Sequence, residues 1–287
     1  MIELLALGSA VLYGAADFFG GLTARRANTI ATVFVSQSVG LVVLLLFLPF
    51  LPSATVSSGD WLWGFAAGVS GGIGVALLYR ALVVGAMAVV APTTAVIAAM
   101  IPVLFAFILG ERLRLLTWGG VAMALVAIAL ISRPASQEVR GSEQSKSRSL
   151  PPGFGLALLS GVAVGIFFLS LARTTTAAGM WPLVAARIAS IVLFGAIALA
   201  TGRTLLMSRT ATATAVTGGA LDMAANALFM IAARVGPLSI VVTLASLYPA
   251  STVLLARVVL GERLSAIQIG GIVCALTAVL IIVGSTG

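Results

Sequence analysis

Apolar runs of about 20 residues, separated by short polar segments, make up almost the whole chain. A helix needs roughly 20 predominantly apolar residues to cross the hydrocarbon core of a bilayer. The pattern therefore predicts about ten transmembrane helices and no water-soluble domain. The expected spans are 2–22, 30–50, 61–82, 86–109, 114–132, 153–172, 181–201, 211–233, 237–260 and 265–284.

Residues 133–152 interrupt this pattern, because they are rich in Ser, Glu, Gln, Arg and Pro and show no apolar periodicity. Such a composition predicts a flexible linker. It separates a first unit, residues 1–132, from a second unit, residues 153–287, and each unit holds five spans. Since five is odd, the second unit must enter the membrane upside down relative to the first. We therefore expect an all-α integral membrane protein of about ten transmembrane helices, arranged as two inverted five-helix repeats.

A repeated motif supports this two-unit interpretation. The sequence Leu-Gly-Glu-Arg-Leu at 109–113 is followed by a Gly pair at 119–120, and the same sequence at 260–264 is followed by a Gly pair at 270–271. The two copies superpose without a gap, as expected for a duplicated unit. Each Glu-Arg pair falls at a short turn between spans, so we interpret both pairs as structural residues that cap and orient the turn.

This doubled motif resembles the EamA-like transporters of the drug/metabolite transporter (DMT) superfamily. In that family a helix that ends in Gly-Glu-Arg is followed by a Gly-containing helix, once in each half, as it is here. The resemblance extends over nearly the whole chain. It implies a membrane transporter and not an enzyme, and export is the commoner role among the bacterial members that the chain resembles.

Composition excludes several other classes of protein. Hydrophobic residues make up 61% of the chain and charged residues 8%, which is too little charge for the surface of a soluble globular domain. The net charge of +8 comes from basic residues that sit singly at the ends of apolar runs, so we expect no nucleic-acid partner. The chain has no histidine, which excludes His-dependent catalysis and His-ligated metals, and we expect neither a metal nor a cofactor.

The distribution of Arg and Lys bears on membrane orientation. More of these residues fall on the side of the linker than on the opposite side. The positive-inside rule then places the linker in the cytoplasm and both termini outside. Related transporters are usually drawn with the termini inside, so both orientations stay open at this point.

Two spans of the second unit carry ionisable residues, which are costly in the hydrocarbon region and mark functional candidates. Asp222 lies near the middle of the eighth span, and Asn226 follows one helical turn later on the same face. Arg187 lies inside the seventh span, and its counterpart in the first repeat is Ser36, next to Gln37. Inverted-repeat transporters hold substrate near the midplane at the repeat interface, and a guanidinium is a good ligand for a carboxylate. We therefore predict that these five residues bind substrate.

Each of these side chains also has a structural interpretation. Asp222 could make a hydrogen bond between packed helices, and Arg187 could pair with Asp222 or Asp17. Asp17 stands toward the end of the first span. A desolvated carboxylate can take up and release a proton, so Asp17 and Asp222 are the predicted proton-coupling residues. Pairing of Asp17 with Arg25 or Arg26 at the helix end is the alternative.

Aromatic residues and helix breakers complete the predicted site. Tyr13, Tyr79 and Tyr248 are candidates to stack on a flat substrate. The fourth span contains Pro92 and Pro102 and the ninth contains Pro249, so paired helices of the two repeats carry prolines that kink helices. We predict a gating or cavity-lining role for the prolines, with packing alone as the alternative. Three glycines at four-residue spacing predict close approach of another helix to the third span: Gly64, Gly68 and Gly72.

Together these observations predict a multi-pass secondary active transporter of the cell (plasma or inner) membrane. It would export a small metabolite such as an amino acid by alternating access, with the lipid bilayer and a small-molecule substrate as partners and the proton as candidate coupling ion. A vitamin or riboflavin-like importer and a non-transporting membrane sensor are the alternatives. An intramembrane aspartyl enzyme using Asp17 and Asp222 lacks the expected Gly-x-Gly-Asp sequence, since Gly219-Ala220-Leu221 precedes Asp222. The sequence leaves monomer and homodimer equally open.

Overall fold

The computed structural model describes residues 1–85, 87–110, 114–131, 152–260 and 266–286. Over these residues the chain is helical and forms no strand. The helices are α1 (Ile2–Ala24), α2 (Thr29–Phe47), α3 (Ser58–Val84), α4 (Met87–Ile108), α5 (Leu115–Ile131), α6 (Phe154–Ala172), α7 (Trp181–Thr201), α8 (Arg209–Val235), α9 (Leu238–Ala245), α10 (Tyr248–Leu260) and α11 (Ala266–Thr286). Two 3₁₀ turns, η1 (Leu48–Phe50) and η2 (Thr176–Ala178), lie between helices.

Each predicted span corresponds to one helix, except the ninth, which is divided into α9 and α10. By length and apolar content, six of the described segments can cross a membrane: α1, residues 29–50, α3, α6, α7 and α8. The all-α membrane fold expected from the sequence is therefore confirmed.

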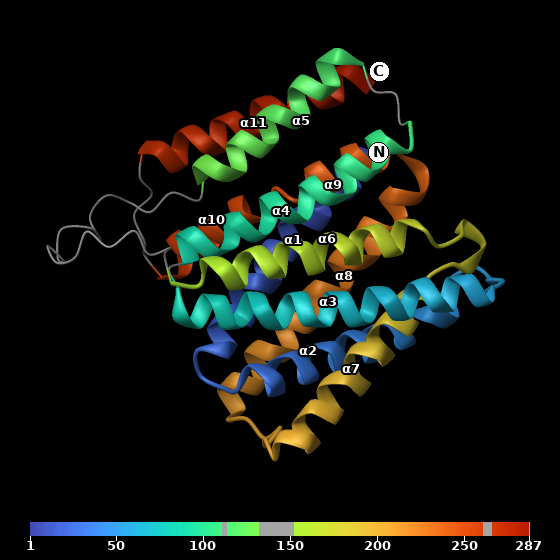
Figure 1. The fold of residues 1–287 in the computed structure, drawn as a ribbon, viewed down its shortest axis with the longest axis vertical. Coiled ribbons are helices and arrows are strands. Elements are labelled where there is room, and N and C mark those ends of the chain that lie inside the picture. The colour runs from blue at the N-terminus through green and yellow to red at the C-terminus, as the bar shows by residue number, and fades with distance from the viewer. Residues whose placement is uncertain (86, 111–113, 132–151, 261–265, 287) are drawn as a thin grey trace, which may run out of the picture.

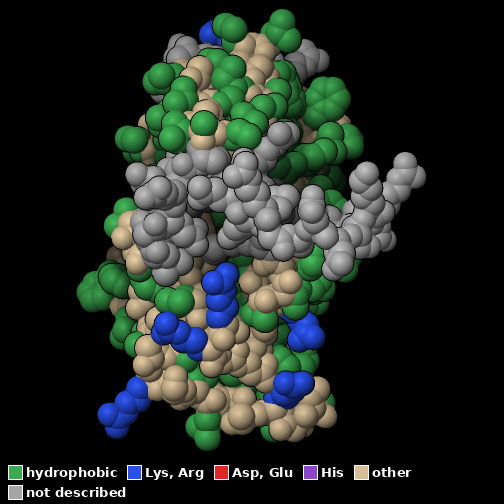
Figure 2. Space-filling view, turned by 90° about the vertical axis from the view of Figure 1, so that its left-hand side faces the viewer, with side chains coloured by type: hydrophobic (Ala, Val, Ile, Leu, Met, Phe, Trp, Pro, Cys, Tyr) green, Lys and Arg blue, Asp and Glu red, His purple; other side chains and the backbone are tan. Residues whose placement is uncertain are grey.

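The helix ends gather at two opposite faces of the bundle (Figure 1). The Arg25 face holds the C-terminal ends of α1, α3 and α7, and the Asp60 face holds Met1 and the N-terminal ends of α3 and α7. Five exposed arginines lie on the Arg25 face: Arg25, Arg26, Arg80, Arg203 and Arg209. Figure 2, which looks at this face, shows Arg side chains there and no acidic side chain among its coloured atoms.

The two repeats are interlaced. Figure 1 shows a row made of α4, α6, α3 and α7, with a second row of α9–α10, α1, α8 and α2 behind it. In both rows each helix packs against neighbours from the other half of the chain. The helices α5 and α11 pack on each other beside the two rows. The arrangement is that of two inverted five-helix repeats, as predicted.

A pair of equivalent hydrogen bonds shows the repeat symmetry at atomic detail. The Ser9 hydroxyl donates to the carbonyl oxygen of Ala225 at 2.9 Å, and the Ser160 hydroxyl donates to that of Gly74 at 2.8 Å. The offset that relates Gly110 to Gly261 also relates Ser9 to Ser160 and Gly74 to Ala225. Both serines are fully buried. Each bond joins helices of different repeats, which is how polar side chains hold helices together in lipid.

Two glycines permit the closest helix crossings at the centre of the bundle. A Cβ added at Gly68 of α3 would collide with the backbone of Ala186 in α7, and one at Gly219 of α8 would collide with the backbone of Ser36 in α2. Gly68 and Gly219 are equivalent positions of the two repeats. Because Arg187 and Gln37 follow directly after the crossing residues, the crossings bring both side chains to the centre.

The prolines behave differently in the two repeats. The ninth span is broken between α9 and α10, and Pro249 lies in the first turn of α10, where a missing N–H costs no helical hydrogen bond. In contrast, α4 continues through both Pro92 and Pro102. The interruption expected in both paired helices is therefore present in the ninth span and absent from the described fourth span. The two Glu-Arg motif pairs and residues 133–151 of the linker lie outside the described residues.

Candidate functional site

A cavity lies at the centre of the bundle, between the two rows of helices. It has a volume of about 60 Å³, which is space for several water molecules. Side chains and backbone from both repeats line it, including glycines of α3 that leave its wall open. Seven of the predicted site residues line this cavity: Tyr13, Asp17, Gln37, Arg187, Asp222, Asn226 and Tyr248.

Arg187 is the central cation of the cavity and is 5% exposed. Its Nη2 donates to Oδ2 of Asp222 at 2.7 Å, and its Nη1 donates to Oε1 of Gln37. Gly40 leaves room for the guanidinium, since a Cβ there would lie 3.2 Å from Arg187 Nε. The pairing with Asp222, one of the two alternatives for Arg187, is therefore present, and Arg187 lines the cavity as well. Its positive charge is balanced within the site.

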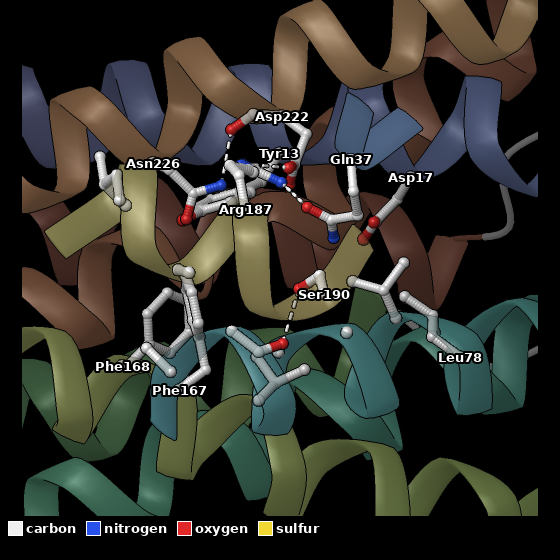
Figure 3. Close-up of a pocket in the computed structure, with 18 of the residues that line it drawn as sticks. Tyr13, Asp17, Gln37, Leu78, Phe167, Phe168, Arg187, Ser190, Asp222 and Asn226 are labelled. Carbon is white, nitrogen blue, oxygen red and sulfur yellow. Dashed lines mark hydrogen bonds and ion pairs between the residues drawn. The ribbon is translucent and has the colours of Figure 1, made fainter. Parts of the chain in front are cut away.

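Asp222 belongs to a chain of polar contacts that spans four helices (Figure 3). The Asn226 amide donates to the backbone carbonyl of Asp222 at 2.7 Å, and the Tyr13 hydroxyl donates to Oδ1 of Asn226 at 2.8 Å. The chain runs from Tyr13 in α1 through Asn226 and Asp222 in α8 to Arg187 in α7 and Gln37 in α2. It therefore links both repeats through side chains that also face the cavity.

Asp17 lines the same cavity one helical turn beyond Tyr13. Within the described part of the chain, its carboxylate makes no hydrogen bond and no ion pair. The alternative of a helix-end pair with Arg25 or Arg26 is therefore not formed. With Arg187 matched by Asp222, Asp17 gives the cavity an excess negative charge whenever both carboxylates are ionised.

Aromatic rings form the apolar part of the cavity wall. The Tyr13 ring packs edge-on against Phe168, with centroids 5.9 Å apart, and against Tyr248, with centroids 6.5 Å apart. Phe168 in turn contacts Phe167 and Phe229, at 5.4 and 4.5 Å between centroids. The site therefore offers aromatic surface next to charged groups, a combination suited to an amphipathic small molecule.

Other predicted residues lie outside the cavity. The Ser36 hydroxyl donates to the carbonyl oxygen of Ala215 at 3.3 Å and helps to pack α2 on α8. Tyr79 is buried against Gly20, whose lack of a side chain leaves space for the tyrosine hydroxyl. Pro102 and Pro249 are both buried, and neither is among the residues that line the cavity, although Pro249 directly follows Tyr248.

The sequence interpretation did not single out several cavity residues, among them Phe167, Phe168 and Ser190. The Ser190 hydroxyl donates to the carbonyl oxygen of Gly68 at 2.6 Å, so its hydrogen-bonding capacity is used inside the wall. These residues look like ordinary members of membrane helices. The repeat offset supplies a signal for one of them, because Phe168 is the counterpart of Asp17.

The sequence model of the EamA-like transporter family matches residues 1–133 and again residues 151–284. No curated protein matches the chain. One solved structure, described only as "Crystal structure of protein", aligns with a TM-score of 0.72 over 97% of this chain and 95% of that chain. Its sequence identity of 17% supports a common fold and nothing finer. The protein thus belongs to the EamA-like transporter family, in keeping with the DMT superfamily, and is a multi-pass membrane transporter.

Proposed function

We propose that the protein is a secondary active transporter that exports a small zwitterionic metabolite, such as an amino acid, across the cell membrane. The observation that carries this proposal is a central cavity, lined by both repeats, in which two carboxylates and one guanidinium stand beside aromatic rings. Inverted repeats that meet at a midplane site are the arrangement on which alternating access depends.

The charges of the cavity match the two ends of an amino acid. A substrate ammonium group is attracted to Asp17, which has no partner among the described residues. A substrate carboxylate competes with Asp222 for Arg187, whose fork of donors suits planar anions. An apolar side chain then contacts Tyr13, Phe168 and Tyr248. An anionic substrate without an ammonium group is less favoured, since Arg187 is already paired.

Energy for export comes from the proton gradient in this proposal. Asp17 binds a proton when the cavity opens to the acidic side, and loses its attraction for the substrate ammonium group as a result. The substrate then leaves on that side, and the proton is released when the cavity opens to the other side. Asp222 serves as the second candidate proton site, because a substrate carboxylate that binds Arg187 leaves Asp222 unpaired.

A flat vitamin such as riboflavin is the second candidate substrate, taken up instead of exported. Tyr13 and Tyr248 favour it, because both rings line the cavity and can stack on a planar molecule. Such a substrate carries no ammonium group for Asp17. The two candidates therefore differ in their dependence on that carboxylate.

Flux in proteoliposomes tests the proposal. Labelled amino acids and riboflavin are offered with and without a pH gradient, to the wild type and to Asp17→Asn, Arg187→Gln and Asp222→Asn. We expect saturable flux of at least one amino acid that the pH gradient drives and that each substitution reduces. The variant Arg203→Gln, altered on the exposed Arg25 face, is the matched control. Riboflavin flux that survives Asp17→Asn would favour the second candidate, and flux unchanged in all three cavity variants would refute the site.

A further inference from the structure

On the Asp60 face a single buried carboxylate joins the two repeats. Asp60 is 2% exposed and lies in the first turn of α3. Its Oδ2 accepts hydrogen bonds from the backbone N–H of Ser57 at 2.9 Å and from the Ser57 hydroxyl at 2.7 Å. Its Oδ1 accepts from the backbone N–H of Thr175 at 2.7 Å, and Oδ2 also accepts from the Thr175 hydroxyl at 3.1 Å. Ser57 belongs to the first repeat and Thr175 to the second.

Further contacts between the repeats surround this carboxylate. The backbone N–H of Thr55 donates to the carbonyl oxygen of Ala177 at 2.9 Å. The rings of Trp61 and Trp181 lie 6.0 Å apart, and the guanidinium of Arg173 lies 5.7 Å from the Trp63 ring. In each pair one residue comes from the segment before or within α3 and the other from the α6–α7 connection or the start of α7. For the Asp60 face to open between these segments, all of these contacts must separate.

The opposite face lacks the carboxylate although it retains the helix cap. Under the repeat offset, Ser57 corresponds to Ser208 and Asp60 to Ala211. Ser208 caps α8 as Ser57 caps α3: its hydroxyl accepts from the N–H of Ala211 at 3.3 Å, and the Ser57 hydroxyl accepts from that of Asp60 at 3.2 Å. Ala211 has no side-chain acceptor, and the counterpart of Thr175 is Ala24.

The described hydrogen bond between the side chains at the end of α1 and the start of α8 is of a weaker kind. On the Arg25 face the Thr23 hydroxyl donates to the Thr214 hydroxyl at 2.7 Å, which is a bond between neutral groups. Hydrogen bonds to an ionised group are about twice as strong as bonds between neutral groups. The two faces, which are related by the repeat symmetry, are therefore held closed by unequal contacts.

We propose that Asp60 is a latch that holds the Asp60 face closed, and that the absence of its counterpart at Ala211 biases the transporter toward states open on the Arg25 face. This inference rests on the proposed alternating access. If the two repeats were identical, exchanging their conformations would convert one open state into the other at no cost in free energy. A contact present on one face alone removes that equality. Asp60 thus sets the resting conformation while lying far from the cavity.

Cysteine labelling tests the latch without any transport measurement. The single cysteine is first removed as Cys274→Ala, and Val75→Cys then places a reporter in the cavity wall. A membrane-impermeant maleimide is applied to one side or the other of sealed vesicles. In separate variants, Leu51→Cys and Arg203→Cys, both at exposed positions, identify the Asp60 face and the Arg25 face. We expect Asp60→Ala to raise labelling of the reporter from the Asp60 face by about fivefold to tenfold.

Three further variants separate the latch from the helix cap. Ser57→Ala removes the cap hydroxyl and leaves both bonds from Thr175, so labelling should stay near the wild-type value. Thr175→Val removes one of those bonds and should give an intermediate increase. The double change Ala211→Asp with Ala24→Thr builds the missing counterpart and should reduce labelling from the Arg25 face.

The outcomes distinguish failure of the latch from failure of alternating access. The latch would be overturned if Asp60→Ala were labelled as the wild type is, or if Ser57→Ala increased labelling as much as Asp60→Ala does. Access to the reporter from both faces in the wild type would still support the transport cycle. A reporter reached from one face alone in every variant would overturn both proposals. Increased labelling of the reporter from the Asp60 face in Asp60→Ala supports the latch even if no tested compound is transported.

Discussion

Arg187 of α7 and Asp222 of α8 form an ion pair at the centre of the bundle, with 2.7 Å between Nη2 and Oδ2. Both residues belong to the second repeat, and Gln37 of the first repeat binds the other side of the guanidinium. The positive charge that the sequence marks as a ligand for anions is thus already engaged. A substrate carboxylate must displace Asp222 to reach it, which couples substrate binding to the contact between α7 and α8.

This ion pair predicts a non-additive effect on stability. Arg187→Gln or Asp222→Asn alone leaves the partner charge uncompensated. We expect each to lower the free energy of unfolding by up to about 3 kcal/mol, the low end for a buried pair, because the Asp222 side chain is 24% exposed. The double variant leaves neither charge and should be more stable than the less stable single variant. Thermal unfolding in detergent measures the difference, with Arg203→Gln as the exposed control. Strictly additive losses would contradict the pairing.

The close helix crossings at the centre of the bundle predict that replacing a crossing glycine by alanine lowers the stability of the protein. Gly219→Ala places a Cβ against the backbone of Ser36, which cannot move away as a flexible side chain does. Overpacking of this kind costs about 1–3 kcal/mol. Gly119→Ala is the matched control, because no described atom lies within 4 Å of the added carbon. Thermal unfolding should separate the two variants, and equal stability would show that α8 and α2 do not cross here.

The exposed arginines predict the orientation of the protein. Five lie on the Arg25 face, where the structure describes no exposed acidic residue, against two, Arg114 and Arg173, on the Asp60 face, which also holds Glu3 and Asp60. The positive-inside rule then places the Arg25 face in the cytoplasm. On intact cells, an impermeant maleimide should label Leu51→Cys and spare Arg203→Cys, both in the Cys274→Ala background. The reverse pattern would place the Asp60 face in the cytoplasm.

The architecture could be predicted from the sequence because a bilayer requires apolar helices of a fixed minimum length. Runs long enough to cross a bilayer, an odd number of them in each half and a gapless repeat together require inverted units. The same offset also relates predicted site residues to further residues of the cavity wall. The counterparts of four predicted residues, Tyr13, Asp17, Asp222 and Asn226, are Val164, Phe168, Gly71 and Val75, and all four counterparts line the cavity.

Other features of the structure could not be predicted, because they depend on contacts between residues that lie far apart in the sequence. Ser57 and Asp60 have the spacing of a capping box, which is visible in the sequence. Their partner Thr175 lies more than a hundred positions away, in the other repeat, so the role of Asp60 as a contact between repeats is not visible. Tyr79 and Ser36 are aromatic or polar residues at a suitable depth, a pattern that predicts contact with substrate. Each instead packs against a neighbouring helix, since depth along a helix does not determine which face is turned to the cavity.

Asp17 predicts a separation between substrate exchange and proton-driven accumulation. A proton-coupling carboxylate is needed to use the gradient, whereas exchange of substrate across the membrane needs only a cavity that opens to both sides. In proteoliposomes, Asp17→Asn should therefore retain exchange of labelled for unlabelled substrate and lose the accumulation that a pH gradient drives. Asp17→Glu, which keeps a carboxylate in the cavity, should restore part of that accumulation. Asp222→Asn is the comparison, because its wild-type carboxylate is already paired with Arg187. Accumulation in Asp17→Asn equal to the wild type would exclude Asp17 as the proton site, and loss of accumulation in Asp222→Asn alone would assign that role to Asp222.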